Sequence, residues 1–169
     1  PKVFPSNYFI FNLEQLAPFF ILETFSKCGL EEPNGLLKFK YLSPGGPYTT
    51  NLWDWDCYWT AFGLIGIMQN RKDNEALKKL QPYVEGSFLN FLSHQGADGA
   101  LPILIMPQEE DPFDCLKSAD NNMAKPFIAQ LAELLDNNDM ISNKQNSATN
   151  SAVSIHITNV LKNAISTII

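Results

Sequence analysis

The stretch YLSPGGPYTTNLWDWDCYWTAFGL, residues 41–64, decides how the rest of the chain is interpreted. It opens with a turn cluster, Ser43-Pro44-Gly45-Gly46-Pro47, whose glycines and prolines exclude a helix interior. The three tryptophans of the chain follow close behind, at Trp53, Trp55 and Trp59. We predict that a helix begins within this aromatic segment and runs to about Asn70.

Two carboxylates, Asp54 and Asp56, are interleaved with these indoles. A sugar ring is bound by flat apolar faces that stack on its C–H bonds and by carboxylates that accept hydrogen bonds from its hydroxyls. The segment offers both, so we predict that it binds a carbohydrate substrate through Trp53, Asp54, Trp55, Asp56, Tyr58 and Trp59. A purely structural reading stays open, because tryptophans often fill a core and an Asp at a helix start is often an N-cap.

Length and charge narrow the class of protein. The 169 residues suffice for one domain with its own core. The formal charge is -6 with 12 Lys and Arg and no basic run, which disfavours a nucleic-acid partner. No apolar run reaches the roughly 18 residues that span a bilayer, so we expect no membrane segment. The start at Pro1, without Met or a signal segment, leaves the compartment open and suggests a piece of a longer protein.

The cysteines and histidines form no ligand pattern. Cys28, Cys57 and Cys115 are far apart and odd in number, and His94 and His156 add no metal-ligand spacing. We therefore expect free thiols, no metal site and no cofactor. The acids between residues 109 and 120 fit no EF-hand pattern, so we interpret them as a solvated acidic loop.

Periodicity predicts mainly helices. Beyond the segment already described, helical patterns cover residues 12–28, a stretch from the cap Asp73 to His94, residues 125–135 and an apolar stripe over 153–168. Alternation of Leu37, Phe39 and Tyr41 with lysines predicts a short extended segment near 36–42. Gly63 and Gly66 are predicted to allow a close helix approach. Residues 97–122 form a long loop, packed through its apolar run at 101–106.

These elements predict an all-α fold. Helices joined by one short and several long loops are typical of helical hairpins in an (α/α) toroid, with the long connections gathered at one end around a cavity. We therefore interpret residues 1–169 as a single helical domain that forms an incomplete part of a larger barrel.

Three segments resemble a known group of enzymes. WDWDCYW at 53–59, preceded by SPGGP, is similar to the Trp-Asp-Ser-Tyr/Phe-Trp element of six-hairpin (α/α)6-barrel glycoside hydrolases of the trehalase and processing α-glucosidase types. QGADGALP at 95–102 and DNNMAKPFIAQ at 120–130 resemble the next two elements of these families, in the same order. Two departures stand out: Cys57 replaces the usual Ser, and Lys125-Pro126 replaces a Pro-Pro pair.

The resemblance implies an inverting glycosidase that acts on an α-glucoside or a related sugar. Asp56 would contact sugar hydroxyls in the -1 subsite, with Trp55 and Trp59 as its wall. Inverting enzymes use two carboxyl groups roughly 6.5–9.5 Å apart, and in these families both lie beyond the part of the barrel represented here. The catalytic residues are therefore unknown, and the rest of the barrel becomes an expected partner. The alternatives are a non-catalytic carbohydrate-binding or structural domain and a helical interaction module with core tryptophans.

Overall fold

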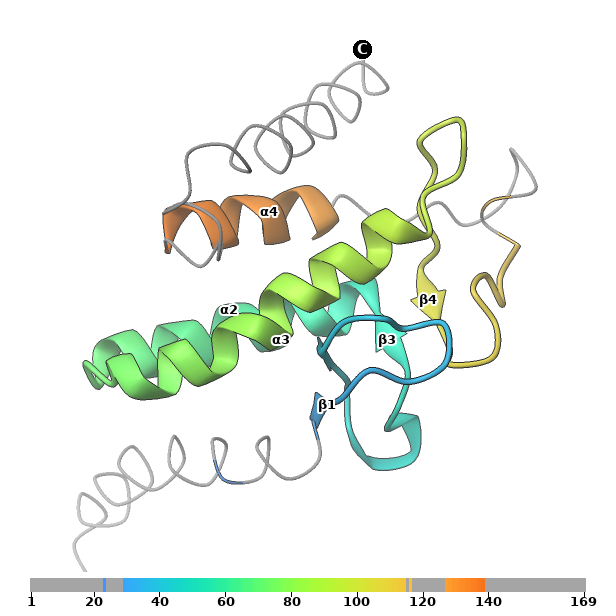
Figure 1. The fold of residues 1–169 in the computed structure, drawn as a ribbon. Coiled ribbons are helices and arrows are strands. Elements are labelled where there is room, and N and C mark those ends of the chain that lie inside the picture. Colours follow the sequence, from blue (N-terminus) through green and yellow to red (C-terminus); the bar gives the residue numbers. More distant parts are fainter. Residues whose placement is uncertain (1–22, 24–28, 115, 117–126, 139–169) are drawn as a thin grey trace, which may run out of the picture.

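The computed structural model describes residues 23, 29–114, 116 and 127–138, and three helices dominate this part of the chain (Figure 1). They are α2 (Asp54–Asn70), α3 (Asn74–Ser93) and α4 (Phe127–Asn137). Four short strands accompany them, namely β1 (Leu30–Glu31), β2 (Tyr41–Leu42), β3 (Leu52–Trp53) and β4 (Leu104–Ile105), together with the 3-10 turn η1 (Gly46–Tyr48). Of the helix predicted at 12–28 only Glu23 is described, and it is helical; the helix predicted at 153–168 lies outside the described residues.

The predicted boundaries of α2 and α3 are confirmed. Trp53 has an extended backbone and directly precedes α2, which begins at Asp54 and ends at Asn70 as expected. Asp73 is the N-cap of α3, and its side chain accepts a hydrogen bond of 3.0 Å from the backbone N–H of Ala76. The described part of the helix predicted at 125–135 is also helical, from Phe127 onward.

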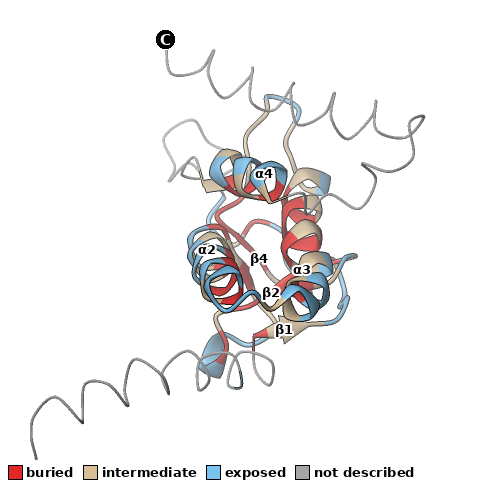
Figure 2. Ribbon diagram, turned by 90° about the vertical axis from the view of Figure 1, so that its left-hand side faces the viewer, coloured by how far each residue is buried: buried red, intermediate tan, exposed pale blue. Residues whose placement is uncertain are grey.

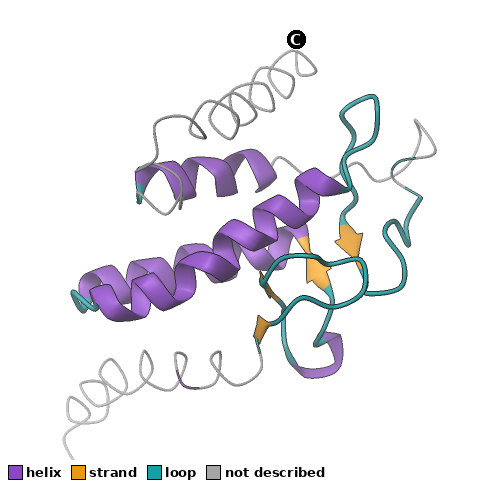
Figure 3. Ribbon diagram, viewed as in Figure 1, coloured by secondary structure: helices purple, strands orange, loops and turns teal. Residues whose placement is uncertain are grey.

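The three helices share a simple arrangement. α2 and α3 form an antiparallel hairpin through the tight turn at 71–73, and α4 lies alongside both and runs parallel to α2. Phe127 at the start of α4 contacts the ring of Trp55 at the head of α2, while Asn138 after α4 is hydrogen-bonded to Gln69 at the far end of α2. The strands and the long connections therefore gather at the end where α2 and α4 begin and α3 ends (Figure 3).

The core lies between the helices and a segment that crosses α3, residues 34–42, which we call the arm (Figure 2). It is built from aliphatic and aromatic side chains of the arm, β3, β4 and the three helices, among them the fully buried Leu37, Tyr41, Leu52, Ile65, Phe88, Phe91, Ile105 and Leu131. Pro102 to Ile105 are buried too, so the long loop after α3 is packed, as its apolar run predicts.

The all-α prediction is corrected by two small antiparallel sheets. β1 pairs with β2, with Leu30 opposite Leu42, and β3 pairs with β4, with Leu52 opposite Ile105. The fold is thus dominated by helices but mixed, and within the extended segment predicted near 36–42 only Tyr41–Leu42 forms a strand.

Side chains of α3 replace the missing strand partners of the arm. The buried Asn90 accepts hydrogen bonds from the backbone N–H groups of Lys38 and Phe39, at 2.8 and 3.1 Å, and donates one of 3.0 Å to the carbonyl of Phe39. Ser87 Oγ accepts a bond of 2.9 Å from the N–H of Leu42. Phe39 itself is 40% exposed, so the predicted alternation buries Leu37 and Tyr41 but not the residue between them.

No described element approaches Gly63 or Gly66, so the close helix approach predicted there does not occur among the described residues. Both are exposed, and a Cβ added at either would meet no described atom within 4 Å. The close approach occurs at Gly86 of α3, where an added Cβ would lie 2.0 Å from the carbonyl oxygen of Lys40 in the arm. Within the described residues, no helix combines the length and apolar character that crossing a bilayer requires.

Candidate functional site

The head of α2 is held in place from three directions. β3 leads directly into it and pairs with β4, and the N–H of Asp54 extends this pairing with a 3.0 Å hydrogen bond to the carbonyl of Ile103. The hydroxyl of the buried Tyr41 donates a 2.7 Å hydrogen bond to the carbonyl of Thr50, just before β3. Thr50 has a φ of 78°, an unusual conformation for a residue with a branched Cβ, and this bond helps to hold it.

Asp54 belongs to the core and not to the surface. Its side chain is fully buried, and Oδ1 accepts a hydrogen bond of 2.6 Å from the N–H of Trp55. Its carbonyl oxygen accepts a bond of 3.3 Å from the thiol of Cys57, which is buried and free. The fully buried Asp54 therefore does not fit the predicted contact with substrate, and its observed contacts are those of a structural residue at the start of α2.

Asp56 occupies a different environment two residues later. It lies in the first turn of α2 and is half-buried, in contrast to the fully buried Asp54. Burial raises the pKa of Asp56 above the ordinary value, and a backbone hydrogen bond opposes this in part. Of the two predicted carboxylates, Asp56 is the less buried one.

Three of the predicted aromatic residues gather on the outer side of α2. Trp55 and Trp59 are 51% and 49% exposed, although both are large apolar side chains. Together with their ring neighbours they form what we call the aromatic patch, which consists of Trp55, Tyr58, Trp59 and Phe62 of α2 and Phe127 of α4. The shortest distance between ring centres is 5.0 Å, between Tyr58 and Trp59.

Trp53 belongs to a second group of rings. Its ring centre lies 6.2 Å from that of Tyr48 in η1 and 5.8 Å from that of Phe113 in the loop after β4. Among the described ring contacts, none joins Trp53 to the aromatic patch. The six predicted site residues therefore separate into one core residue, one ring facing the loops, and a set of four in the first two turns of α2. Of these four, Trp55 and Trp59 are exposed, and Asp56 and Tyr58 are half-buried.

Sequence reasoning did not include Phe127, Phe62, Tyr48 or Phe113 in the site. Phe62 and Phe127 lie within two of the predicted helices, where an aromatic side chain is an ordinary core residue, and Tyr48 and Phe113 lie outside the predicted helices, where no periodicity identifies a partner. The signal that could have found Phe127 is its place in the segment at 120–130, one of the three that carry the family resemblance.

The described parts of these three segments meet at one end of the molecule. The segment at 95–102 leads into Ile103 and β4, which pair with the residues that open α2. Its turn is closed by a 2.8 Å hydrogen bond from the N–H of Gly96 to the carbonyl of Ala100. The described part of the third segment, 127–130, opens α4 and contacts Trp55 through Phe127.

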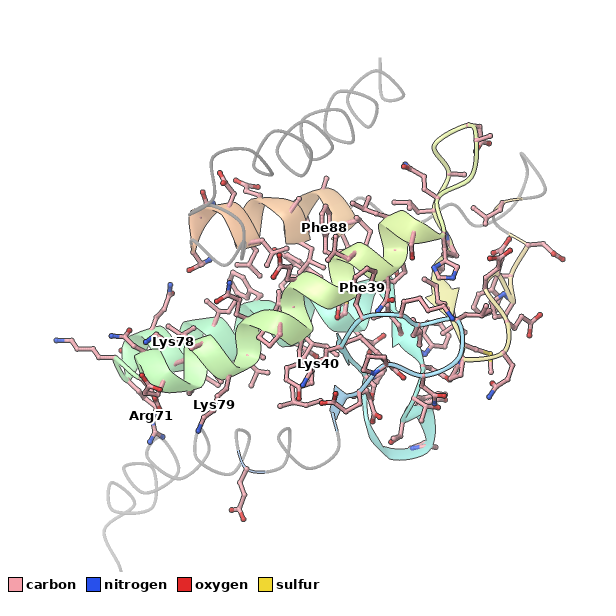
Figure 4. All side chains as sticks on the ribbon, in the orientation of Figure 1. Phe39, Lys40, Arg71, Lys78, Lys79 and Phe88 are labelled. Carbon is pink, nitrogen blue, oxygen red and sulfur yellow. The ribbon has the colours of Figure 1, made fainter. Side chains whose placement is uncertain are left out.

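The charges of the described residues are distributed unevenly along the helices. Arg71, Lys78 and Lys79 lie at the turn between α2 and α3, at the end away from β3 and β4 (Figure 4). The loop beyond β4 instead carries the exposed acids Glu109 and Glu110 and the buried Asp111, whose Oδ2 accepts a 2.8 Å bond from the N–H of Leu116. Among the described residues, no cluster of three His, Cys, Asp or Glu side chains could hold a metal ion.

Comparison with known proteins adds no relative. No protein-family model, curated protein or solved structure matches the chain.

Proposed function

We propose that this chain is part of an inverting six-hairpin glycoside hydrolase that acts on an α-glucoside or a related sugar. In this proposal it supplies one side of the -1 subsite. Trp55 and Trp59 form an apolar wall on which the sugar ring stacks, and Asp56 accepts hydrogen bonds from its hydroxyls. The proposal depends mainly on one observation, the meeting of the three resembling segments at the head of α2.

The exposure of the indoles supports a binding role. A tryptophan that serves only the core is expected to be mostly enclosed, whereas Trp55 and Trp59 each leave about half of their surface open. They lie one helical turn apart on the same side of α2, with the half-buried Asp56 in the same two turns. This is the combination that stacking and hydroxyl recognition require.

The composition of α2 supports the assignment to a larger barrel. Residues 57–68 contain no charged side chain, although Phe62, Gly63 and Gly66 are exposed. A helix that is apolar on all sides is typical of the interior of a larger structure. α2 and α4 are parallel, with α3 antiparallel to both, as successive inner and outer helices of a toroid would be. A three-helix bundle has the same order, so the uncharged outer face of α2 is what favours the toroid.

The alternative is a carbohydrate-binding domain without catalysis. The aromatic patch and Asp56 lie within the described residues, and we assign neither the general acid nor the general base of an inverting mechanism to them. Binding that persists in the longer protein without any hydrolysis would favour this second function.

Intrinsic fluorescence offers a direct test, because all three tryptophans lie at the head of α2. We expect titration with glucose, maltose or trehalose to change the emission of the 169-residue chain. Asp56→Asn should weaken binding about tenfold or more, since a hydrogen bond to a charged group contributes about 1.5–3 kcal/mol. Glu75→Gln, in the first turn of α3, is the matched control and should bind as the wild type does.

Two results would contradict the proposal. Asp56→Asn could lower the free energy of unfolding while leaving sugar affinity unchanged, which would make Asp56 a helix-start residue only. Hydrolysis of trehalose or an aryl glycoside by the 169-residue chain alone would refute the assignment of the catalytic pair to another part of the barrel.

A further inference from the structure

Phe127 is the ring that connects the members of the aromatic patch. Its ring centre lies 5.7 Å from that of Trp55, 5.5 Å from that of Tyr58 and 6.4 Å from that of Trp59. It is the only described residue outside α2 whose ring contacts the patch members, and it contacts both half-exposed indoles. One side chain of α4 therefore supports two side chains that stand a full helical turn apart on α2.

The ring angles show what kind of support this is. The planes of Trp55 and Phe127 meet at 77°, and those of Trp59 and Phe127 at 62°, so both indoles pack edge-to-face with the same phenyl ring. Edge-to-face packing is orientation-dependent, because the positive ring edge of one partner faces the negative ring face of the other. A half-exposed indole without such a neighbour could occupy several rotamers.

The position of Phe127 is itself fixed by the rest of α4. Behind its first turn, Ile128, Leu131 and Leu135 are buried in the core, and Asn138 is hydrogen-bonded to Gln69 at the far end of α2. α4 is thus held along α2 over its whole length, and Phe127 cannot slide relative to Trp55 and Trp59 without disturbing these contacts.

We propose that Phe127 is a positioning residue of the carbohydrate site, which fixes the orientation of both indoles on which the sugar stacks. This inference rests on the proposed function, since it concerns the same binding surface. In this role Phe127 acts through Trp55 and Trp59, and the sugar need not contact Phe127 itself. Affinity for a sugar then depends on the ring at position 127 through the rotamers of Trp55 and Trp59.

The test compares Phe127→Leu with Phe127→Tyr, which keeps the aromatic ring. A third variant, Ile128→Val, trims a buried side chain of the same turn that makes none of these ring contacts, and it controls for a general loss of stability. The near-ultraviolet circular dichroism of the tryptophans reports the orientation of the indoles, and their fluorescence reports binding of glucose and maltose.

We expect Phe127→Leu to change the tryptophan bands of the dichroism spectrum and to weaken sugar binding about three- to tenfold, the range that an aromatic pair contributes. Phe127→Tyr should retain the spectrum and the affinity. Ile128→Val should lose stability while changing neither.

Two outcomes separate this inference from the proposed function. If the wild-type chain binds sugar and Phe127→Leu leaves both spectrum and affinity unchanged, the positioning role is refuted while the proposed function stands. If the wild-type chain binds no sugar, the proposed function fails, and the positioning of a carbohydrate site fails with it, even where the spectrum shows that Phe127 orients the indoles.

Discussion

Replacing Asn90 by Ala should destabilise the fold more than any single hydrogen bond could. The substitution removes three hydrogen bonds at once, two accepted from the N–H groups of Lys38 and Phe39 and one donated to the carbonyl of Phe39. Each contributes about 0.5–1.5 kcal/mol net. Asn90 is fully buried, so no water replaces its side chain without entering the core. We expect a loss of about 3 kcal/mol in the free energy of unfolding.

Urea unfolding followed by tryptophan fluorescence measures this loss, with an unchanged m-value as the sign that the unfolding transition is otherwise the same. The control is Ser93→Ala, on the next turn of α3, an exposed residue whose hydroxyl donates a bond of 2.8 Å to the carbonyl of Asn90 and lies 3.1 Å from Nδ1 of His94. It should cost less than about 1 kcal/mol. If Asn90→Ala costs no more than this control, the arm is held by the burial of Leu37 and Tyr41 and not by the amide.

Three further outcomes are expected. Gly86→Ala should destabilise by about 1–3 kcal/mol, because the new Cβ would lie 2.0 Å from the carbonyl oxygen of Lys40; Gly63→Ala, where nothing lies within 4 Å, should instead gain up to about 1 kcal/mol in the same urea titration. In a chain whose other two cysteines are replaced by serine, the Cys57 thiol should react with Ellman's reagent only as fast as the protein opens, since it is buried and burial raises its pKa; immediate reaction would contradict the buried position. Burial also raises the pKa of Asp56, so the folded state binds this proton more tightly than the unfolded state, and its contribution to stability is lost as pH rises above the ordinary Asp pKa of about 4. Asp56→Asn should therefore be more stable than wild type at pH 7 and approach it at about pH 3; an equal gap at both pH values would contradict the cause given for the shift.

The helices could be predicted from the sequence because their signals are local. Asp73 and the N–H of Ala76 that it caps are three residues apart, and the turn at 71–73 separates two long periodic stretches. Start and end signals of this kind depend on neighbours along the chain, not on the tertiary fold.

The strands could not be predicted in the same way. Each is two residues long, too short to show a period of two, and β3 finds its partner some fifty residues away in β4. The arm is a stronger example. Its alternating pattern suggests a paired strand, yet Lys38 and Phe39 are bonded to the side chain of Asn90. Asn90 forms these hydrogen bonds with residues about fifty positions away, so the sequence around Asn90 contains no pattern that predicts them.

The sequence could not show which of the two acids at the head of α2 is buried. Asp54 and Asp56 are equally close to the tryptophans in sequence, but only Asp54 stands on the helix face that continues through Cys57 and Ala61 into the core. Periodicity could not separate the two faces, because Trp55, Trp59 and Phe62 make the opposite face apolar as well. The residues that bury one face, in α3 and the arm, decide which acid is fully buried.

The outer face of α2 has two regions that differ in their side chains. Trp55 and Trp59 occupy its first two turns, next to Asp56, β3 and the loops. Gly63 and Gly66 lie further along, where the face is apolar, lacks acids and leaves room for a backbone to approach. A sugar needs polar partners beside an aromatic wall and so fits the first region, whereas a packed helix needs small apolar residues and fits the second. Phe62 lies at the boundary, one turn beyond the indoles. Under the proposed function, assembly with the rest of the barrel should therefore be sensitive to a bulky side chain at Gly66 and insensitive to loss of the Trp55 ring, while the proposed sugar binding should show the reverse.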